Sequence, residues 1–381
     1  MTRCASASDP QREMSRLPPT LAIAERNPTM LPTSASRELS YEDYLATDHR
    51  PAFDGLRGLG FLFVVTAHVP SVRLFDYLQG WAAVWVFLVM SGYLVTMLMM
   101  REEKRSGRIA FGPFLVRRFF RIVPSYWAAI LLYWLACYAL PPLWEDYPRF
   151  MARLPAYLAF MPEYADIDGF SIFTHSWTVG VELKFYLLFP AVLFLILGSI
   201  KWRFTATAAA AALFAAHGAF LSGAYCAVLC GAMLALALEQ PRGYAFVAAL
   251  TRVPAVVPVA LIAGLLVLLH FGERFTALAA AMTWLLAYTI VREAAVSRML
   301  TWRPLAYLGR RSYGAYLLHF LALRIGYMFF GDDSATSGLL AAAFCLALTM
   351  PAAELMYRMI ERPGRDLARG LLSRVQTAAI R

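Results

Sequence analysis

Long runs of apolar residues, separated by short polar segments, extend along most of this chain. An α-helix needs about 20 such residues to cross the hydrocarbon core of a bilayer, and most of the runs approach that length. The pattern predicts an all-α, polytopic membrane protein with about ten transmembrane helices. The expected helices cover residues 55–72, 81–100, 122–140, 177–200, 204–222, 223–239, 254–271, 275–291, 305–329 and 336–360.

The two ends of the chain lack this pattern. The first 45 residues are rich in Ser, Thr, Pro and Arg, and they contain no apolar core like that of a cleaved signal peptide. We therefore expect residues 1–50 to form a disordered cytosolic tail and residues 366–381 to form a basic cytosolic tail. The ten-helix domain would occupy residues 51–365 between them.

Composition agrees with a membrane protein, and the basic residues give it a direction. Hydrophobic residues make up 60% of the chain and charged residues only 16%, far from the values of ordinary soluble domains. Cytoplasmic loops usually carry an excess of Lys and Arg, and such an excess appears here if both termini are cytoplasmic. The outer loops then carry only Arg73, Arg149, Arg153 and Arg274.

The net charge of +10 does not require a nucleic-acid partner. Basic cytosolic loops that meet anionic membrane lipids account for most of it, and the sequence has no zinc-finger spacing, helix-turn-helix or mixed aromatic and basic patch. The five cysteines are scattered, without the spacing of a metal site. We expect contacts with membrane lipids, no nucleic acid and no metal.

Arginines at the cytosolic ends of the expected helices form a first candidate site. Arg57 enters the first helix from the cytosol, and Arg118 and Arg121 lie where the third helix leaves it. Arg suits phosphate because its guanidinium is planar, permanently charged and carries a fork of donors. We expect these three residues to hold a phosphorylated cytosolic ligand. Plain anchoring at the inner leaflet is the alternative, which we favour for Arg117.

A second candidate site lies deeper, with His68 on the first helix, Glu182 on the fourth and His319 on the ninth. An ionisable residue inside a span is costly and by default marks a site. Because the fourth helix runs inward, Glu182 should reach the depth of His68 and orient its imidazole, which would act as a general base. For His175 and His319, a structural hydrogen bond between helices is about as plausible as a catalytic role. No role is expected for His49, His217 or His270.

Six sequence segments stand in a fixed order between about residue 50 and residue 365. They are FDGLRGLGFLFVVTAHV from Phe53, VFLVMSGYLVT from Val86, GRIAFGPFLVRRFFRIVPSYW from Gly107, HSWTVGVELKFYLLFP from His175, YLGRRSYGAYLLH from Tyr307 and ERP from Glu361. Together they resemble the successive landmarks of bacterial acyltransferase family 3. Each motif alone is modest, but the ordered set is specific.

The resemblance implies a fold and an activity. Members of that family are ten-helix proteins of the bacterial inner (plasma) membrane. They pass an acyl group, usually acetyl from cytosolic acetyl-CoA, to sugar hydroxyls of O-antigen, exopolysaccharide, Nod factors or macrolides. In the family, an Arg and a His separated by ten residues mark the first helix, here Arg57 and His68. An Arg-x-x-Arg pair marks the third, here Arg118 and Arg121.

This chain departs from the family pattern on two helices. On the fourth helix the family commonly shows Ser-x-Glu-Glu-Gln-Phe-Tyr, whereas this chain begins with Gly180, keeps the first Glu as Glu182 and has Lys184 in place of Gln. Trp85 replaces an acidic residue that is common before the Ser-Gly of the second helix. The residues expected to support the site or to contact the acceptor are His175, Trp177, Tyr186 and His319.

The outer loop at residues 141–176 is the longest expected on that side. Its aromatic rings could stack on sugar rings and its carboxylates could accept hydroxyl hydrogens, although an ordinary interfacial loop has the same composition. Some relatives carry a soluble C-terminal esterase-like domain, so a separate periplasmic acyl-handling protein is a candidate partner. The residues in question are Trp144, Glu145, Asp146, Tyr147, Tyr157, Tyr164, Asp166 and Asp168.

These expectations combine into one hypothesis: an O-acyltransferase that uses acetyl-CoA as donor and a surface saccharide or lipid-linked sugar as acceptor. The arginines would bind the CoA phosphates, and the pantetheine arm would reach His68. A proton-coupled exporter or flippase of a lipid-linked saccharide is the alternative, because cations at one face and protonatable groups at mid-depth also suit transport. The chain shows no paired halves with matching interrupted helices, which argues against transport.

Overall fold

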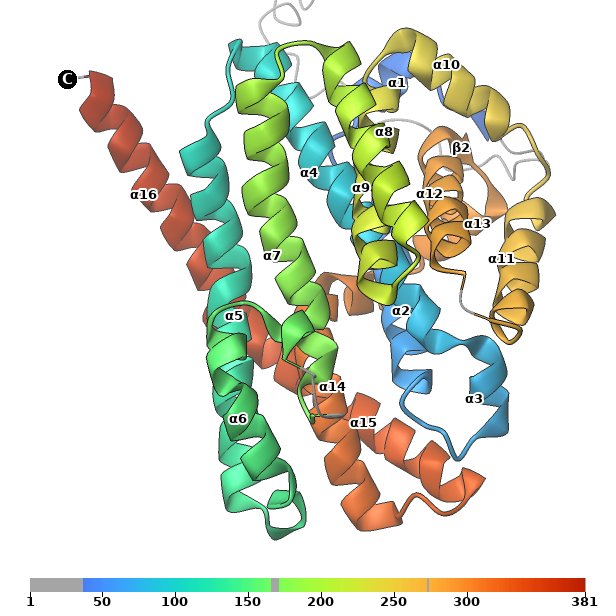
Figure 1. The fold of residues 1–381 in the computed structure, drawn as a ribbon, viewed down its shortest axis with the longest axis vertical. Helices are drawn as coiled ribbons and strands as arrows, with labels where there is room; N and C mark the ends of the chain where they lie inside the picture. Colours follow the sequence, from blue (N-terminus) through green and yellow to red (C-terminus); the bar gives the residue numbers. More distant parts are fainter. Residues whose placement is uncertain (1–36, 166–170, 273, 381) are drawn as a thin grey trace, which may run out of the picture. The chain divides into compact units, whose positions relative to one another are not determined.

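A computed structural model describes residues 37–165, 171–272 and 274–380 of the chain. Within these ranges nearly every element is helical, and the one sheet has two strands of two residues each (Figure 1). The predicted all-α fold is confirmed. The α-helices are α1 (Tyr41–Ala46), α2 (Pro51–Thr66), α3 (Arg73–Leu78), α4 (Val84–Ser106), α5 (Phe111–Ala139), α6 (Asp146–Leu158), α7 (Trp177–Pro190), α8 (Ile200–His217), α9 (Phe220–Leu238), α10 (Pro241–Leu250), α11 (Val256–Leu269), α12 (Phe275–Val291), α13 (Ala295–Leu300), α14 (Arg303–Phe330), α15 (Ala335–Met356) and α16 (Arg362–Ile380).

Five helical stretches in the described residues are long and apolar enough to cross a bilayer. Helices α11 and α12 are apolar but shorter. These lengths fit the membrane protein that the hydrophobic pattern predicts, whereas the count of ten spans and the cytoplasmic termini remain predictions. The five stretches are Arg73–Ser106, Phe111–Ala139, Thr174–Ile196, Phe220–Leu238 and Ala335–Arg374.

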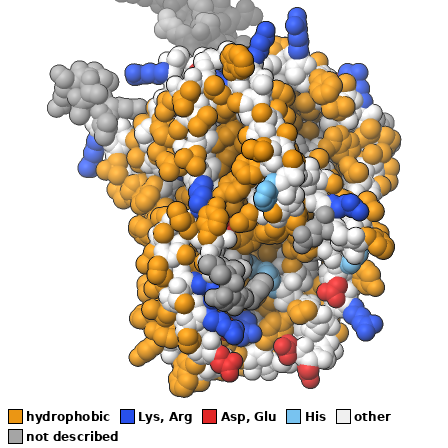
Figure 2. Space-filling model, viewed as in Figure 1, with side chains coloured by type: hydrophobic (Ala, Val, Ile, Leu, Met, Phe, Trp, Pro, Cys, Tyr) orange, Lys and Arg blue, Asp and Glu red, His pale blue; other side chains and the backbone are white. Residues whose placement is uncertain are grey.

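Apolar side chains cover most of the molecular face shown in Figure 2, as expected for helices that meet lipid. Lys and Arg side chains appear along the upper margin of this view, near the ends of several helices. Many Leu and Phe side chains are exposed on the surfaces of the long apolar helices, among them Leu131 of α5 and Leu213 of α8. In water such a surface would aggregate, so this distribution agrees with a membrane environment.

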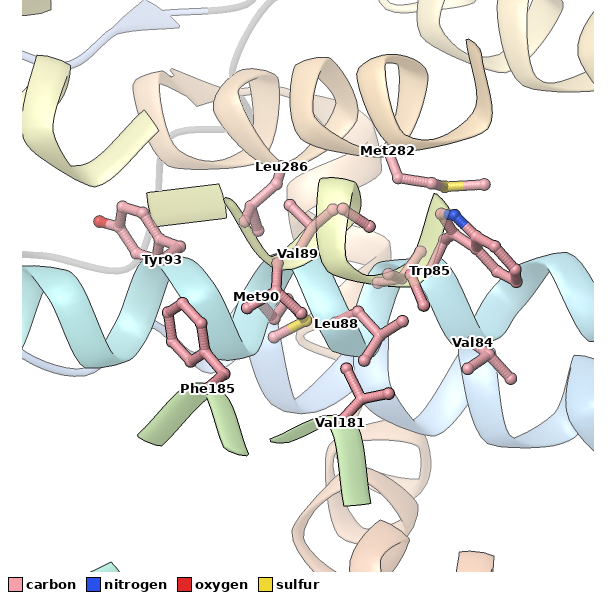
Figure 3. Close-up of a cluster of buried hydrophobic side chains, with 14 of the residues drawn as sticks. Val84, Trp85, Leu88, Val89, Met90, Tyr93, Val181, Phe185, Met282 and Leu286 are labelled. Carbon is pink, nitrogen blue, oxygen red and sulfur yellow. The ribbon is translucent and has the colours of Figure 1, made fainter. Parts of the chain in front are cut away.

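Helix α4 is the most deeply buried of the long helices and lies between α7 and α12 (Figure 3). Its side chains Leu88 and Met90 are almost completely buried, and Val181 of α7 and Leu286 of α12 pack in the same cluster. A helix that is apolar on all sides belongs inside a bundle. This central position lets α4 contribute to every cavity described below.

Glycines let α4 and α9 approach each other closely. A Cβ atom added at Gly92 would lie 1.9 Å from the carbonyl oxygen of Val228, and one added at Gly231 would lie 2.0 Å from that of Val89. Small residues at helix crossings are typical of membrane bundles, where backbones pack directly against each other. The α4–α9 crossing therefore depends on the absence of side chains at these two positions.

Part of the expected N-terminal tail is ordered. Residues 1–36 lie outside the described residues, but β1 (Arg37–Glu38) pairs antiparallel with β2 (Arg292–Glu293), and α1 follows it. The N-cap of α1 is Ser40, whose side chain accepts a hydrogen bond from the backbone N–H of Asp43. The bundle thus begins before residue 51, the expected start of the helical domain.

A buried carboxylate attaches this N-terminal segment to the bundle. The side chain of Glu239, which follows α9, is fully buried and accepts hydrogen bonds from Arg101 Nε at 2.8 Å, Lys104 Nζ at 2.8 Å and Tyr44 Oη at 3.0 Å. A buried charge needs such partners, because burial removes its hydration. The tyrosine belongs to α1 and the two cations belong to α4, so Glu239 joins both helices.

Two helix boundaries differ from the expected ones and change where site residues lie. Helix α2 ends at Thr66 instead of continuing to residue 72, so His68 lies in the turn that follows the helix. Pro70 favours this early end, because a proline disfavours helical geometry in the residue before it. Helix α5 begins at Phe111 instead of residue 122, which places the predicted Arg-x-x-Arg pair within a helix.

Candidate active site

Three cavities with shared lining residues run through the bundle. The basic vestibule, of about 610 Å³, lies between α4, α5 and α16, and the arginine cavity, of about 420 Å³, continues from it. Four residues line both: Leu98, Arg118, Arg121 and Arg365.

The histidine cavity, of about 190 Å³, is lined by His68 and His175 and adjoins the arginine cavity through Val84 and Tyr316, which line both. The three cavities therefore lie next to one another in the bundle.

The basic vestibule is rich in arginine, but some of these cations already have acidic partners. Asp48 accepts hydrogen bonds from Arg101 at 2.8 Å and from Arg105 at 3.2 Å. The hydrogen bond from Arg101, with a further one from Arg105, holds the pKa of Asp48 below its usual value despite some desolvation. Arg117 lies 3.7 Å from Glu102. This pairing agrees with an anchoring role for Arg117.

The three arginines expected to bind phosphate do come together, in the arginine cavity. Arg57 comes from α2, while Arg118 and Arg121 are three residues apart on α5 and therefore share one helix face. Arg57 lies only 4.0 Å from the carboxylate of Asp54, whereas no carboxylate within the described ranges forms an ion pair with Arg118 or Arg121. These two guanidiniums are available to an anionic ligand.

Arg118 is held between aromatic rings. Its guanidinium lies 5.4 Å from the ring centre of Phe114 and 5.3 Å from that of Tyr186, distances at which a cation is attracted to a π-system. The rings fix the orientation of Arg118 without neutralising its charge. Tyr186, expected from sequence to support the site or to contact the acceptor, lines the arginine cavity.

The structure places Glu182 with the arginines and not with His68, contrary to the expected pairing. Glu182 lines the arginine cavity and accepts a hydrogen bond of 3.3 Å from Tyr186 Oη, which also contacts Ser91 Oγ. The physical reason is depth. His175 precedes α7 and already lies beside the histidine cavity, so Glu182, seven residues later, lies about 10 Å further along the helix.

Glu361 is a site residue that the residue-by-residue reasoning missed. It lines the arginine cavity from a π-helical turn, Tyr357–Glu361, its exposed fraction is 6%, and its Oε1 has no hydrogen-bond partner among the described residues. Single π-turns inside helices often occur at functional sites. The ERP segment, which carries the family resemblance, was the available signal.

The histidine cavity brings together three histidines from different parts of the sequence. The ring of His319 lies 5.3 Å from that of His68 and 5.0 Å from that of His175, centre to centre. His319 is fully buried and His175 is 7% exposed, whereas His68 is partly exposed to the cavity. His175 and His319, for which a structural and a catalytic role are equally plausible from sequence, are thus neighbours of His68, the expected base.

Aromatic side chains form the rest of this cavity. Trp177 lies 4.8 Å from Phe220, centre to centre, and Trp85 is stacked on Phe275. Trp81 and Trp85 line the cavity together with Trp177. No Asp or Glu is found among the described residues that line it. The cavity therefore offers imidazoles and flat rings instead of carboxylates.

Tyr316 forms the boundary between the arginine and histidine cavities. Its hydroxyl donates a hydrogen bond of 2.6 Å to the carbonyl oxygen of His175 and accepts one of 3.2 Å from Thr178 Oγ1. These bonds tie α14 to the start of α7. Any ligand that extends from the arginines to the histidines must pass this side chain and Val84.

The unusual residues of α7 fit one another. Lys184 forms an ion pair with the buried Glu163 and donates a hydrogen bond of 2.9 Å to the carbonyl oxygen of Phe160. A Cβ atom at Gly180 would lie 2.0 Å from Glu163 Oε2. The glycine therefore makes room for the same carboxylate that the lysine neutralises. Pairing of Lys184 with Glu182, which the sequence argued against, is not what the structure shows.

The long loop before α7 contributes to the histidine cavity near its end. Ser171 and Thr174 line the cavity, whereas Tyr157 is buried and donates a hydrogen bond of 2.9 Å to Ser171 Oγ. Asp166 and Asp168 lie outside the described residues. The expected role of this loop in acceptor selectivity remains a prediction.

Comparison with known proteins shows which kind of protein this chain resembles. A family model described as an acyltransferase domain matches residues 50–358. A protein of Listeria monocytogenes named Peptidoglycan O-acetyltransferase OatA is 25% identical over 354 residues, which cover 83% of this chain and 56% of the relative. No solved structure matches the chain.

Shorter matches carry similar names. A protein of Staphylococcus aureus (strain MSSA476) named Putative O-acetyltransferase is 27% identical over 173 residues, covering 43% of this chain and 28% of the relative. The chain thus spans between about a quarter and about half of the length of these relatives.

Proposed function

Because this chain belongs to acyltransferase family 3, whose model matches residues 50–358, we propose that it is a membrane O-acyltransferase. It moves an acyl group, most simply acetyl, from cytosolic acyl-CoA to a hydroxyl group of a surface saccharide or lipid-linked sugar. The observation that carries this proposal is the series of neighbouring cavities, with arginines at one end and histidines at the other.

The donor enters by the basic vestibule. CoA carries several phosphate groups, and guanidinium groups bind phosphate through charge-assisted, often bidentate hydrogen bonds. Arg118 and Arg121 line both the vestibule and the arginine cavity, so one ligand can contact them while lying partly in each. Arg57 adds charge from α2, although Asp54 lies close to it.

The pantetheine arm then extends through the arginine cavity toward His68. This cavity also exposes the carboxylates of Glu182 and Glu361, which can accept hydrogen bonds from the two amide N–H groups of the arm. The thioester passes Val84 and Tyr316 and reaches the histidine cavity. On this proposal only the slender arm goes past Val84 and Tyr316, and the bulky nucleotide stays with the arginines.

The reaction needs a base at the end of this path. His68 removes the proton of the acceptor hydroxyl while the oxygen attacks the thioester carbonyl carbon, which forms a C–O bond. The C–S bond then breaks, and the sulfur takes a proton from the imidazolium. The ester and free CoA leave, and His68 returns to its neutral form. An acyl group held briefly on the protein is a variant of the same chemistry.

The histidine cavity suits a sugar ring as acceptor. The three tryptophans that line it, Trp81, Trp85 and Trp177, present flat apolar faces, and such rings bury large contact areas without losing specificity. Two relatives carry peptidoglycan in their names, so amino-sugar polymers are one acceptor class to test.

The test is transfer of radiolabelled acetyl from acetyl-CoA in membrane vesicles whose cytosolic face is accessible. We expect the wild-type protein to move label into saccharide and His68→Ala to lose at least 100-fold in rate, since general bases contribute about 10²–10⁴. His270→Ala serves as the matched control, because His270 is exposed, contacts Tyr77 and lines none of the three cavities.

Full activity of His68→Ala, at equal protein amounts in the membrane, contradicts the proposed role of this residue. Wild-type vesicles that transfer no label but move an unlabelled lipid-linked saccharide across the membrane would instead support the transporter alternative.

A further inference from the structure

Each of the two histidines behind His68 uses one ring nitrogen to bind the backbone. His319 Nδ1 lies 2.6 Å from the carbonyl oxygen of Tyr316, and His175 Nε2 lies 3.2 Å from that of Leu317. A carbonyl oxygen can only accept, so the hydrogen must be on the ring nitrogen in both bonds. The backbone of α14 therefore sets the tautomer of both imidazoles.

The remaining ring nitrogens must then be bare lone pairs. They are His319 Nε2 and His175 Nδ1, and neither has a hydrogen-bond partner among the described residues, although both are buried. An unmet buried acceptor costs free energy, so a structure keeps one only where something else satisfies it. Two such acceptors converge within one cluster, next to His68.

From this geometry we infer that His319 and His175 are positioning residues, whose bare nitrogens share the second N–H proton of the imidazolium that forms when His68 takes the proton of the acceptor. This inference rests on the proposed function and adds to it. When the acceptor binds, the His68 ring, 5.3 Å from that of His319 centre to centre, turns so that His319 Nε2 accepts its N–H, and the other nitrogen of His68 faces the cavity as the base. His175 Nδ1, beside His319, provides a second acceptor for the same proton.

The need for such acceptors follows from the missing carboxylate. An imidazolium formed in a medium of low dielectric constant is costly unless a partner stabilises it. A carboxylate usually fills this role, but no acidic side chain lines the described part of the histidine cavity, and Glu182 lies with the arginines. Neutral imidazoles supply lone pairs without adding a permanent charge to the acceptor site.

The proton is conserved through the cycle. It leaves the acceptor hydroxyl, stays on the cavity-facing nitrogen of His68 while the tetrahedral intermediate exists, and passes from there to the departing sulfur of CoA. No nitrogen of the cluster forms or breaks a bond to carbon, and no oxidant, metal or further reactant takes part.

Asparagine and glutamine can separate this role from a structural one. The amide group of Asn lies where Nδ1 of a histidine lies, and the amide group of Gln lies where Nε2 lies. At position 319, His319→Gln keeps an acceptor for His68 and loses the bond to Tyr316, while His319→Asn does the reverse. At position 175 the two nitrogens have exchanged roles, so His175→Asn keeps the bare acceptor and His175→Gln keeps the backbone bond.

The measurement is kcat and KM for acetyl-CoA in the vesicle assay, with His270→Gln as control. Proton sharing predicts that His319→Gln exceeds His319→Asn in kcat, and that His175→Asn exceeds His175→Gln, each by roughly 10- to 100-fold, the value of a hydrogen bond to a charged group. KM for acetyl-CoA should stay within about twofold, because the phosphates bind in another cavity. A merely structural role predicts the opposite order at both positions.

The outcomes separate this inference from the proposed function. If wild type is active and His68→Ala is not, but the order of the four variants is reversed or all four equal wild type, the inference is wrong and the acyltransferase proposal stands. If the wild-type protein itself transfers no acetyl group, the proposed function fails, and the inference fails with it.

Discussion

Single arginines differ in what they can do for a ligand, although the sequence shows them as one basic cluster. Arg101, Arg105 and Arg117 have carboxylate partners, whereas Arg118 lies against the rings of Phe114 and Tyr186 and has no ion pair within the described residues. Arg121 faces both the vestibule and the arginine cavity. A cation without an acidic partner has more to gain from a phosphate. The donor should therefore depend on particular arginines and not on net charge.

Replacing Arg121 tests this difference. Arg121→Ala should raise the half-saturating concentration of acetyl-CoA roughly 10-fold, the worth of one charge-assisted hydrogen bond, while kcat at saturation falls less. Arg108→Ala is a suitable control, because Arg108 is exposed shortly before α5 and lines none of the three cavities. The measurement is initial rate against acetyl-CoA concentration. An unchanged half-saturating concentration for Arg121→Ala would contradict the assignment.

The sequence predicts best the placement of charged side chains in apolar helices, because burying a charge in the membrane costs free energy. Arg57, Arg118 and Arg121 were grouped because charges in apolar helices demand a reason, and they share a cavity. The predicted pairing of Glu182 with His68 is wrong. His175, seven residues earlier, already lines the same cavity as His68, so Glu182 lies further along α7. The pairing of Gly180 and Lys184 with Glu163 could not be foreseen, since it depends on a contact with a separate segment.

At the scale of elements, helices were predicted well and their ends were not. Apolar runs identify a membrane helix because length and composition suffice. The ends depend on contacts made elsewhere: the turn that holds His68 is fixed by Tyr327 of α14, whose hydroxyl donates a hydrogen bond of 3.0 Å to the His68 carbonyl. The order in residues 37–50 also depends on distant partners, such as Glu239.

The crossing of α4 and α9 offers a test at this scale. Gly231→Ala places a Cβ atom 2.0 Å from the carbonyl oxygen of Val89, and backbone cannot move as a flexible side chain can. We expect a loss of about 1–3 kcal/mol of stability, typical of overpacking, or failure to accumulate in the membrane. Gly264→Ala on α11 is the matched control, because nothing lies within 4 Å of its added Cβ atom. Thermal unfolding in detergent measures both variants, and equal transition temperatures would show that the helices can move apart freely.

At the scale of the whole molecule, the site is an arrangement of cavities that no local pattern contains. The sequence indicated two layers of polar residues, but the shared lining residues depend on how α2, α4, α5, α7 and α14 pack together. Val84 carries no signal of function in the sequence, and Tyr316 is only one residue of the family-like segment that begins at Tyr307. Both gain importance because they line two neighbouring cavities. Such positions can be identified only from the way the helices pack, because their residue types give no indication.

Blocking this junction should separate donor binding from transfer. Val84→Trp fills the passage with a larger ring, so we expect transfer to fall more than about 100-fold while binding of CoA in the vestibule and arginine cavity is retained. Val84→Ala leaves the passage open and should keep most of the activity. Equilibrium binding of CoA and acetyl transfer are measured on the same membranes. Normal transfer by Val84→Trp would mean that the thioester reaches His68 by another route.

The narrow junction at Val84 and Tyr316 also governs how products depart. On the proposed mechanism the nucleotide never passes it, so spent CoA must withdraw by the way it entered, while the esterified sugar leaves from the opposite end. Product inhibition should then depend on sidedness: free CoA slows turnover when supplied in the cytosolic compartment and has no effect from the other. Acyl groups would then leave the cytosol on the sugar, while CoA itself stays on the cytosolic side.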